Sequence, residues 1–221
     1  MRALLRRVPD ANVVALSRHP ARLEQLQARL EGEDLERFVG VSADVGDQAG
    51  ATAARRLVLR EAGAYEVVIP SLGGWWEGRL LDVDDATYDR VMREMFRAHF
   101  AFARAFVPPL RERGAGLYLG IGGGAALYPV QNSSLVSIAG AAQLMLTRAL
   151  AAETAGSGVT IRELVVNGPV NTRDSAEAAG PNWITADEIG EVVAELVATG
   201  ATAWPNQRER GPLLIMDPLR S

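Results

Sequence analysis

Short apolar runs alternate with longer amphipathic segments along the whole chain. The apolar runs have the length of buried strands and cover residues 12–17, 38–43, 65–70, 116–120, 159–166 and 213–216. The segments between them have the apolar spacing of helices and cover residues 20–30, 47–63, 84–110, 133–154 and 185–198. Strands separated by helices imply right-handed crossovers and a parallel sheet with helices on both faces. The pattern predicts an α/β fold with a doubly wound parallel sheet.

The ends of the predicted helices carry capping and breaking signals. Thr185 precedes the last helix and is a good N-cap, as is Asn132 or Ser133 for the helix before it. Pro108-Pro109 lies at the end of the long helix over residues 84–110. Because proline lacks a backbone N–H, we expect this pair to close that helix.

Length and composition fit one soluble domain over residues 1–221. Two domains would each be short at this length. Hydrophobic residues make up 48% and charged residues 23% of the chain, which is ordinary for a globular protein. The net charge of −4 attracts neither nucleic acid nor an anionic membrane. No apolar run approaches the about 18 residues of a membrane-spanning helix, so we expect a cytoplasmic protein that binds no membrane and no nucleic acid.

The residue inventory argues against thiol and metal chemistry. Cysteine is absent, which excludes disulfides, thiol nucleophiles and thiolate metal sites. The two histidines, His19 and His99, are far apart in sequence and have no acidic residue at ligand spacing. We therefore predict no metal site.

Four short motifs follow the predicted strands and helices in a recognisable order. They are Asp44-Val45, Gly73-Gly74, the helical segment Tyr88 to Phe100, and the segment Asn167 to Thr172. Their order and spacing resemble the short-chain dehydrogenase/reductase family, from about Asn12 to Asp217. The resemblance implies a Rossmann-like fold and a nicotinamide-dependent oxidoreductase ancestry.

The residues that carry this family's chemistry are replaced at the matching positions. The resemblance places the catalytic serine at Gly123, the tyrosine at Val136, the lysine at Gly140, and the asparagine that holds a proton-relay water at Met95. Carbonyl reduction needs a proton donor, and a tyrosine serves at neutral pH only when a nearby cation lowers its pKa. The chain contains no lysine, because all 23 of its basic residues are arginine. We therefore predict that none of these four positions is catalytic.

The segment before the first predicted strand also departs from the family pattern. The family places a strand and a glycine-rich phosphate loop there, whereas residues 1–11 contain no glycine, and residues 2–7 resemble the helix that follows that loop. Dinucleotide phosphates bind to such a loop at a helix N-terminus. We expect the sheet to lack its first strand and the protein to bind no cofactor. Two explanations stay open: a shortened chain, for example from a misplaced start codon, or a gap filled by a partner or a rearranged N-terminus.

If a cofactor binds, the resemblance implies NADP(H) and three contact residues. Arg18 lies where NADP-preferring members hold the 2′-phosphate, Asp44 where members contact adenine, and Thr172 where members bond the carboxamide. Each has a simpler interpretation. We favour a solvated arginine for Arg18 and a turn residue for Thr172. For Asp44, adenine contact and a cap on the following helix stay equally open.

Three further features lie near the expected cleft. Tyr128 is a possible substitute acid, but no neighbouring cation is evident, so a packing role is preferred. Trp75-Trp76 follows the third strand and either stacks on a ligand or partner or covers the long helix. His99 lies one helical turn after Met95, and we expect it to be structural.

The leading hypothesis is a catalytically inactive family member that serves as a non-catalytic subunit or scaffold. The alternatives are an NADP(H)-dependent oxidoreductase with displaced residues, such as Tyr128 with an arginine, and a sensor that binds NADP(H) without turnover. The helices over residues 84–110 and 133–154 are expected to pair in a homo-oligomer or with an active paralogue. The second of these is apolar around most of its circumference, more than one core-facing stripe requires.

Overall fold

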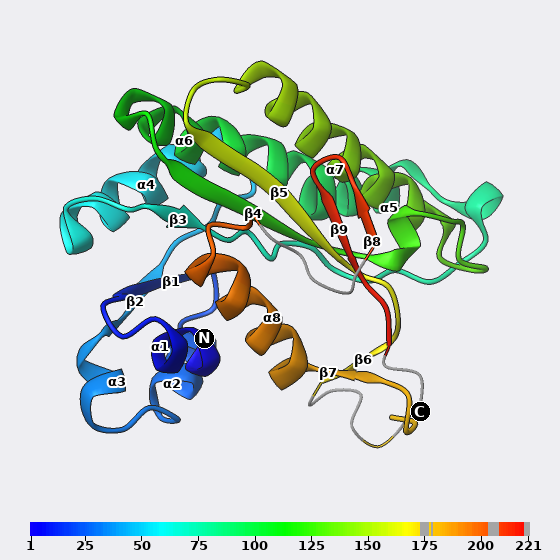
Figure 1. Ribbon diagram of the computed structural model, residues 1–221. Helices are drawn as coiled ribbons and strands as arrows, with labels where there is room; N and C mark the ends of the chain where they lie inside the picture. Colours follow the sequence, from blue (N-terminus) through cyan, green and yellow to red (C-terminus); the bar gives the residue numbers. More distant parts are fainter. Residues whose placement is uncertain (173–176, 178, 203–207, 219–221) are drawn as a thin grey trace.

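The strands form two main sheets that are separate from each other. The computed structural model describes residues 1–172, 177, 179–202 and 208–218 (Figure 1). The smaller sheet pairs β1 (Val13–Ser17) with β2 (Phe38–Ser42) in parallel. The larger sheet has the strand order β3-β4-β5-β9-β8. Within the described residues, β1 and β3 are not hydrogen-bonded to each other, so the two sheets part along these two strands.

The larger sheet is parallel except at one edge. Its strands are β3 (Val67–Val68), β4 (Gly116–Gly123), β5 (Val159–Val166), β9 (Leu213–Met216) and β8 (Arg208–Arg210). Only β8 runs antiparallel to its neighbour, β9. Two short segments, β6 (Val170–Asn171) and β7 (Ile184–Thr185), form a further parallel pair. The predicted limits of β5 and β9 are confirmed, whereas β3 is shorter than the predicted strand and β8 was not predicted.

Helices cover both faces of the larger sheet, as Figure 1 shows. One face carries α4 (Gln48–Ala62), α5 (Asp85–Met92), α6 (Ala98–Arg113) and α7 (Ser134–Glu153). The other face carries α8 (Ala186–Ala198), and the smaller sheet is accompanied by α1 (Arg2–Arg7), α2 (Pro20–Gln27) and α3 (Gly32–Glu36). Short 3-10 turns are η1 (Leu80–Asp82) and η3 (Gly124–Ala126). The predicted α/β, Rossmann-like class is confirmed.

The long helix predicted over residues 84–110 differs from the structure in two ways. A π-helical turn, η2 (Arg93–Arg97), separates α5 from α6. The helix also continues through Pro108-Pro109 to Arg113, and Gly114 with φ 70° ends it. Proline fixes φ near its helical value, so near a helix end it mainly removes N–H groups. A left-handed glycine is the stronger stop signal, and the expectation that the prolines close the helix was wrong.

The caps of the other helices follow local side-chain chemistry. The Thr185 hydroxyl accepts a hydrogen bond from the Glu188 N–H at 3.1 Å, and the Glu188 carboxylate accepts one from the Thr185 N–H at 2.6 Å, which completes a capping box. Asp47 caps α4 by accepting from the Gly50 N–H at 2.8 Å. Ser133 occupies the N-cap position of α7, but its side chain makes no capping hydrogen bond.

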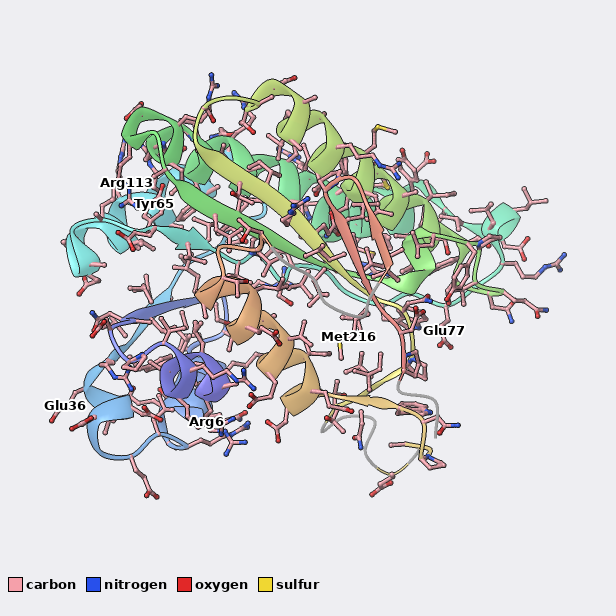
Figure 2. The ribbon with its side chains drawn as sticks, in the orientation of Figure 1. Arg6, Glu36, Tyr65, Glu77, Arg113 and Met216 are labelled. Carbon is pink, nitrogen blue, oxygen red and sulfur yellow. The ribbon has the colours of Figure 1, made fainter. Side chains whose placement is uncertain are left out.

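Helix α1 binds the smaller sheet to the rest of the molecule. Leu5 is only 1% exposed and packs in a cluster with residues of the smaller sheet. On the opposite side, Arg7 lies 2.6 Å from Glu191 of α8, and Arg6 pairs with the same carboxylate (Figure 2). Exposed ion pairs contribute at most about 1 kcal/mol. Burial of Leu5 therefore stabilises this contact more than the charges do.

One carboxyl group is fully buried in the core beneath α7. Glu163 of β5 accepts a hydrogen bond from Gln143 Nε2 at 2.9 Å and another from the Thr147 hydroxyl. It fits because the neighbouring strand has glycine at Gly120 and Gly122, and a Cβ at Gly122 would collide with the Glu163 carboxyl. Burial raises the pKa of Glu163 from 4.5 to about 7, and the two hydrogen bonds only partly oppose this.

The buried glutamate makes stability fall as pH rises. Between pH 4.5 and about 7 the folded protein keeps a proton that the unfolded chain releases, so the free energy of unfolding decreases through this window. The full loss above pH 7 is on the order of 1–3 kcal/mol. Glu163→Gln keeps the shape without the charge. We predict that it removes this loss in urea denaturation between pH 5 and 8, whereas the control Glu112→Gln, on the surface of α6, retains it. Identical pH profiles for Glu163→Gln and the unchanged protein would contradict this.

Candidate functional site

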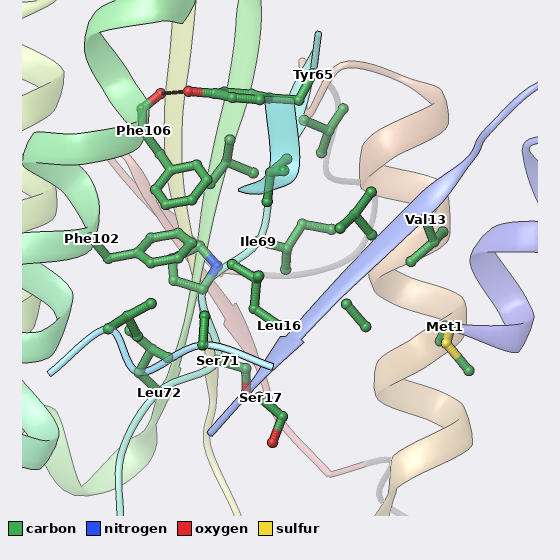
Figure 3. A pocket seen from close by; sticks show the side chains of 18 of the residues that line it. Met1, Val13, Leu16, Ser17, Tyr65, Ile69, Ser71, Leu72, Phe102 and Phe106 are labelled. Atoms are coloured by element: carbon green, nitrogen blue, oxygen red, sulfur yellow. Dashed lines mark hydrogen bonds between the residues drawn. The ribbon is translucent and has the colours of Figure 1, made fainter. Parts of the chain in front are cut away.

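A cavity of about 1530 Å³ lies between the two sheets, and we call it the slot. One wall is β1, and the other is the segment over residues 65–73 that contains β3 (Figure 3). Phe102 and Phe106 of α6 line one face, and Ile189 and Val193 of α8 line the other. The slot is thus apolar at its centre.

Arg18 lies at the rim of the slot and is paired with protein groups. It follows β1, and its guanidinium is 3.5 Å from Glu94 Oε1 in η2. Its Nε donates to Nε2 of His19 at 3.3 Å. The same Glu94 carboxylate is also 3.8 Å from Arg90. Arg18 therefore faces an acidic partner where a 2′-phosphate would have to bind.

Asp44 also lines the slot and closes a local turn. Its carboxylate accepts a hydrogen bond from the Gly46 N–H at 2.9 Å. The cap of α4 is Asp47, so the capping interpretation of Asp44 was wrong. Thr172 is exposed after β6 and is not among the described residues that line the slot. The structure thus brings together Arg18 and Asp44, but not Thr172.

The three catalytic positions of the family lie where β4 meets α7. Gly123 ends β4 and is exposed, and a Cβ there would meet no atom within 4 Å. Val136 of α7 is 3% exposed. Gly140, one turn further, packs against η3, because a Cβ there would lie 3.0 Å from Cβ of Ala126. A larger side chain at position 140 would require this turn to shift by a few tenths of an ångström.

Met95 lies in the π-helical turn η2, beside Gly73 in the loop after β3. Such turns are frequent at functional sites, because they change the direction of side chains. One turn later, His99 is 1% exposed and bonds the Leu72 carbonyl at 3.0 Å. Burial lowers the pKa of His99, which favours its neutral form. His99 thus anchors the loop after β3 and is structural, as expected.

Three polar side chains that follow β4, β5 and β9 form a hydrogen-bonded chain. The Tyr128 hydroxyl donates to Oδ1 of Asn167, and Nδ2 of Asn167 donates to Asp217 Oδ1 at 2.6 Å. A Cβ at Gly124 would collide with Asn167 Oδ1, so glycine at this position permits the arrangement. The alternative of a displaced active site paired Tyr128 with an arginine, whereas the observed partner of its hydroxyl is Asn167. Tyr128 is half exposed, so its ring is not a buried packing residue.

The two adjacent tryptophans have different environments. Trp75 is 58% exposed, and its Nε1 donates to Glu77 at 2.9 Å. Trp76 is half-buried and lies over Gly78, where a Cβ would collide with its ring. Trp75 therefore does not cover the core.

Two further findings concern metal binding and membrane spans. Across the described ranges, no group of three or more His, Asp or Glu side chains is arranged to hold a metal ion. Helix α7, in contrast, is long and apolar enough by composition to cross a membrane, although we expected no such segment. Its residues Gln143 and Thr147 bond the buried Glu163, and Leu144 is packed in the core. These contacts are those of a core helix.

The polar chain predicts a contrast between neighbouring glycines. Gly124→Ala should cost about 1–3 kcal/mol of unfolding free energy, because its Cβ would displace Asn167. Gly123→Ala is the matched control, because Gly123 has the extended backbone of φ −109° and ψ 158° with open space around it. Its effect should stay within about 1 kcal/mol. Urea denaturation of both variants measures the difference, and equal effects would refute the described contact.

The chain resembles known dehydrogenases in sequence. It is 30% identical over 127 residues to a 2-(R)-hydroxypropyl-CoM dehydrogenase of Xanthobacter autotrophicus, a match that covers 56% of this chain and 51% of that protein. It is 28% identical over 135 residues to an "Inactive 2-(S)-hydroxypropyl-CoM dehydrogenase 2" of the same organism, covering 61% and 58% of the two chains. The matches thus span about half of the length of these curated relatives.

The solved structures agree in fold. An alcohol dehydrogenase from the archaeon Thermococcus sibiricus, complexed with 5-hydroxy-NADP, superposes with a TM-score of 0.80 at 19% identity. This superposition covers 99% of this chain and 91% of that one. The family model described as short chain dehydrogenase matches residues 6–180, well over half of the sequence. The chain therefore belongs to the short-chain dehydrogenase family.

Proposed function

We propose that this family member is catalytically inactive and serves as a non-catalytic subunit or scaffold. The observation that carries the proposal is the packing at the tyrosine and lysine positions. Val136 is buried where the family has its tyrosine, and Gly140 is packed against Ala126 where the family has its lysine. Neither position offers a proton donor or a cation. General acid–base assistance raises the reaction rate roughly 10²–10⁴-fold. In this proposal the chain lacks both the proton donor and the cation that would lower the donor's pKa.

One curated relative is itself named inactive, which supports the proposal. The replacements in this chain run in one direction, from polar catalytic residues to small or apolar ones. Catalytic residues often cost stability, so their loss is tolerated once the chemistry is not needed. The frame of sheet and helices is retained, which fits a role that depends on shape.

The cofactor of the family does not fit the residues present. Dinucleotide phosphates need backbone N–H groups of a glycine-rich loop at a helix N-terminus. Residues 1–11 contain no glycine, and the short helix α1 occupies this part of the chain. Arg18, the candidate for a 2′-phosphate, faces Glu94. We therefore expect this chain to bind NADP(H) weakly or not at all, although a structural neighbour was solved with an NADP derivative.

Two alternatives rest on specific contacts. The hydrogen-bonded chain from Tyr128 through Asn167 to Asp217 favours a displaced active site, because it orients an exposed phenol. The position of Arg18 and Asp44 at one rim of the slot favours a nucleotide sensor. We place both second to the inactive scaffold.

An assay of nicotinamide-dependent reduction tests the proposal. The purified protein should reduce simple ketones with neither NADPH nor NADH, and Tyr128→Phe should leave this unchanged, because no residue pair supplies the proton. Reduction that disappears in Tyr128→Phe would identify Tyr128 as the acid and overturn the inactive assignment. Reduction that survives in Tyr128→Phe would overturn it as well and would imply a different acid.

The partner surface of the proposed scaffold is the outer face of α6 and α7. Phe100 of α6 and Ile138 and Met145 of α7 are 43%, 46% and 58% exposed, respectively. Apolar side chains on neighbouring helices in this number favour a second buried surface. We propose that these helices pair in a homo-oligomer or with an active paralogue. The absence of cysteine is consistent with the cytoplasmic location proposed for this protein.

Light scattering tests this surface with a matched pair of variants. The unchanged protein should form an oligomer at micromolar concentration, either alone or with a paralogue of the same genome. Met145→Arg should dissociate it, since a charge would be buried in the interface. Leu81→Arg is the control, because Leu81 is 92% exposed in η1, away from both helices. A monomer under all these conditions would contradict the proposal.

A further inference from the structure

Asn167 is followed by Gly168 in the segment that joins β5 to β6, and this is the single Asn-Gly pair in the sequence. A residue without a Cβ lets its backbone nitrogen approach the preceding side chain closely. Glycine is also required here by packing, since a Cβ at this position would lie 2.9 Å from Cγ of Pro218. The fold therefore keeps an asparagine amide next to an unhindered peptide nitrogen.

The side-chain amide of Asn167 is held at both ends. Its Nδ2 donates to Asp217 Oδ1 at 2.6 Å, and its Oδ1 accepts from the Tyr128 hydroxyl. A carboxylate only accepts hydrogen bonds, so the amide nitrogen must face Asp217 and the amide oxygen must face Tyr128. A hydroxyl that donates to a carbonyl oxygen stabilises the negative charge that develops there when a nucleophile adds to the carbon. Tyr128 thus polarises this amide for attack.

The backbone nitrogen of Gly168 is available as the nucleophile. The neighbouring Asn167 N–H donates to the Met216 carbonyl at 2.8 Å, which fixes the backbone before the amide. Within the part of the chain that the structure describes, the Gly168 N–H donates no hydrogen bond. Its reaction therefore breaks no such bond. Both residues are half-buried, so water has access to the pair.

We propose that Asn167 is a site of spontaneous deamidation in the folded protein, with Tyr128 polarising its amide. The Gly168 nitrogen bonds to Cγ of Asn167 and loses its proton to solvent, while the Cγ–Nδ2 bond breaks and Nδ2 leaves as ammonia. Water then opens the resulting succinimide ring at either carbonyl and gives aspartate or isoaspartate. The net reaction exchanges ammonia for water and is not a redox step. This site is independent of the proposed catalytic inactivity.

Deamidation changes the hydrogen-bonded chain at its centre. The Tyr128 hydroxyl can still donate to the new carboxylate, but the donor to Asp217 is lost. Two carboxylates at this separation repel each other. Asp217 follows β9, which is paired with β5 in the larger sheet, so the repulsion acts between the ends of two neighbouring strands. The modification should therefore loosen the segment after β9.

Peptide mapping by mass spectrometry tests the site in the unchanged protein. The protein is incubated at mildly alkaline pH in heavy-oxygen water, and label is followed at each asparagine. Asn132, which is exposed and precedes Ser133, is the internal control. If exposure alone decided the rate, Asn132 would convert first, whereas the proposal predicts that Asn167 does. Conversion of Asn132 first, or of Asn167 only after unfolding in urea, would overturn the proposal.

Tyr128→Phe tests the polarising hydroxyl. It should slow conversion of Asn167 about two- to tenfold in the folded protein, because one hydrogen bond to the reacting carbonyl is removed. In urea, where this contact is absent, the rate should be unchanged. Tyr88→Phe is the matched control, since Tyr88 is 49% exposed on α5, and its rates should equal those of the unchanged protein. An unchanged folded-state rate in Tyr128→Phe would refute the role of Tyr128.

Asn167→Asp reproduces the aspartate product and tests the consequence. It should lower the urea midpoint, because the new carboxylate faces Asp217. Asn132→Asp adds the same charge at an exposed position and should leave the midpoint nearly unchanged. Equal midpoints for the two variants would contradict the predicted repulsion.

Discussion

The β1–β2 pair is held to the rest of the molecule by side-chain packing and not by backbone hydrogen bonds to the larger sheet. Val14 and Leu16 pack against the core formed by α4 and α6, while Leu5 of α1 anchors the outer side. In a doubly wound sheet, hydrogen bonds between neighbouring strands normally carry this connection. Their absence between β1 and β3 leaves a slot where a family member with a continuous sheet would have a strand.

Several glycines in and near β4 make room for neighbouring side chains. Glycines at Gly120 and Gly122 admit the buried Glu163, and Gly124 admits Asn167 and its link to Tyr128. Gly140 lets η3 pack closely on α7. Gly123, in contrast, has open space around it.

The sequence predicted the elements well where hydrophobic periodicity decides structure. The limits of β5 and β9 follow from their apolar runs, and the cap at Thr185 follows from local chemistry. Pro108-Pro109 was misjudged because a proline near a helix end costs little compared with the stop at Gly114. That Gly123, Val136 and Gly140 are not catalytic stays a prediction from their spacing; in the structure Val136 is buried and Gly140 packs against Ala126.

Contacts between residues far apart in the chain could not be predicted from the sequence. The partner of Tyr128 depends on how β4 and β5 bring Asn167 next to it. The burial of Glu163 depends on its register with Gly120, and Glu163 alone in an apolar strand gives little signal. The pairing of Arg18 with Glu94 joins residues that are distant in the chain. Such contacts depend on topology, which hydrophobic periodicity does not encode.

The central proposal is that this chain keeps the fold of the family but binds NADP(H) weakly or not at all. Calorimetric titration of the purified protein with NADPH measures that claim most directly. The proposal predicts no saturable heat up to millimolar cofactor, because Arg18, the candidate contact for a 2′-phosphate, is paired with Glu94. A dissociation constant in the micromolar range would contradict it.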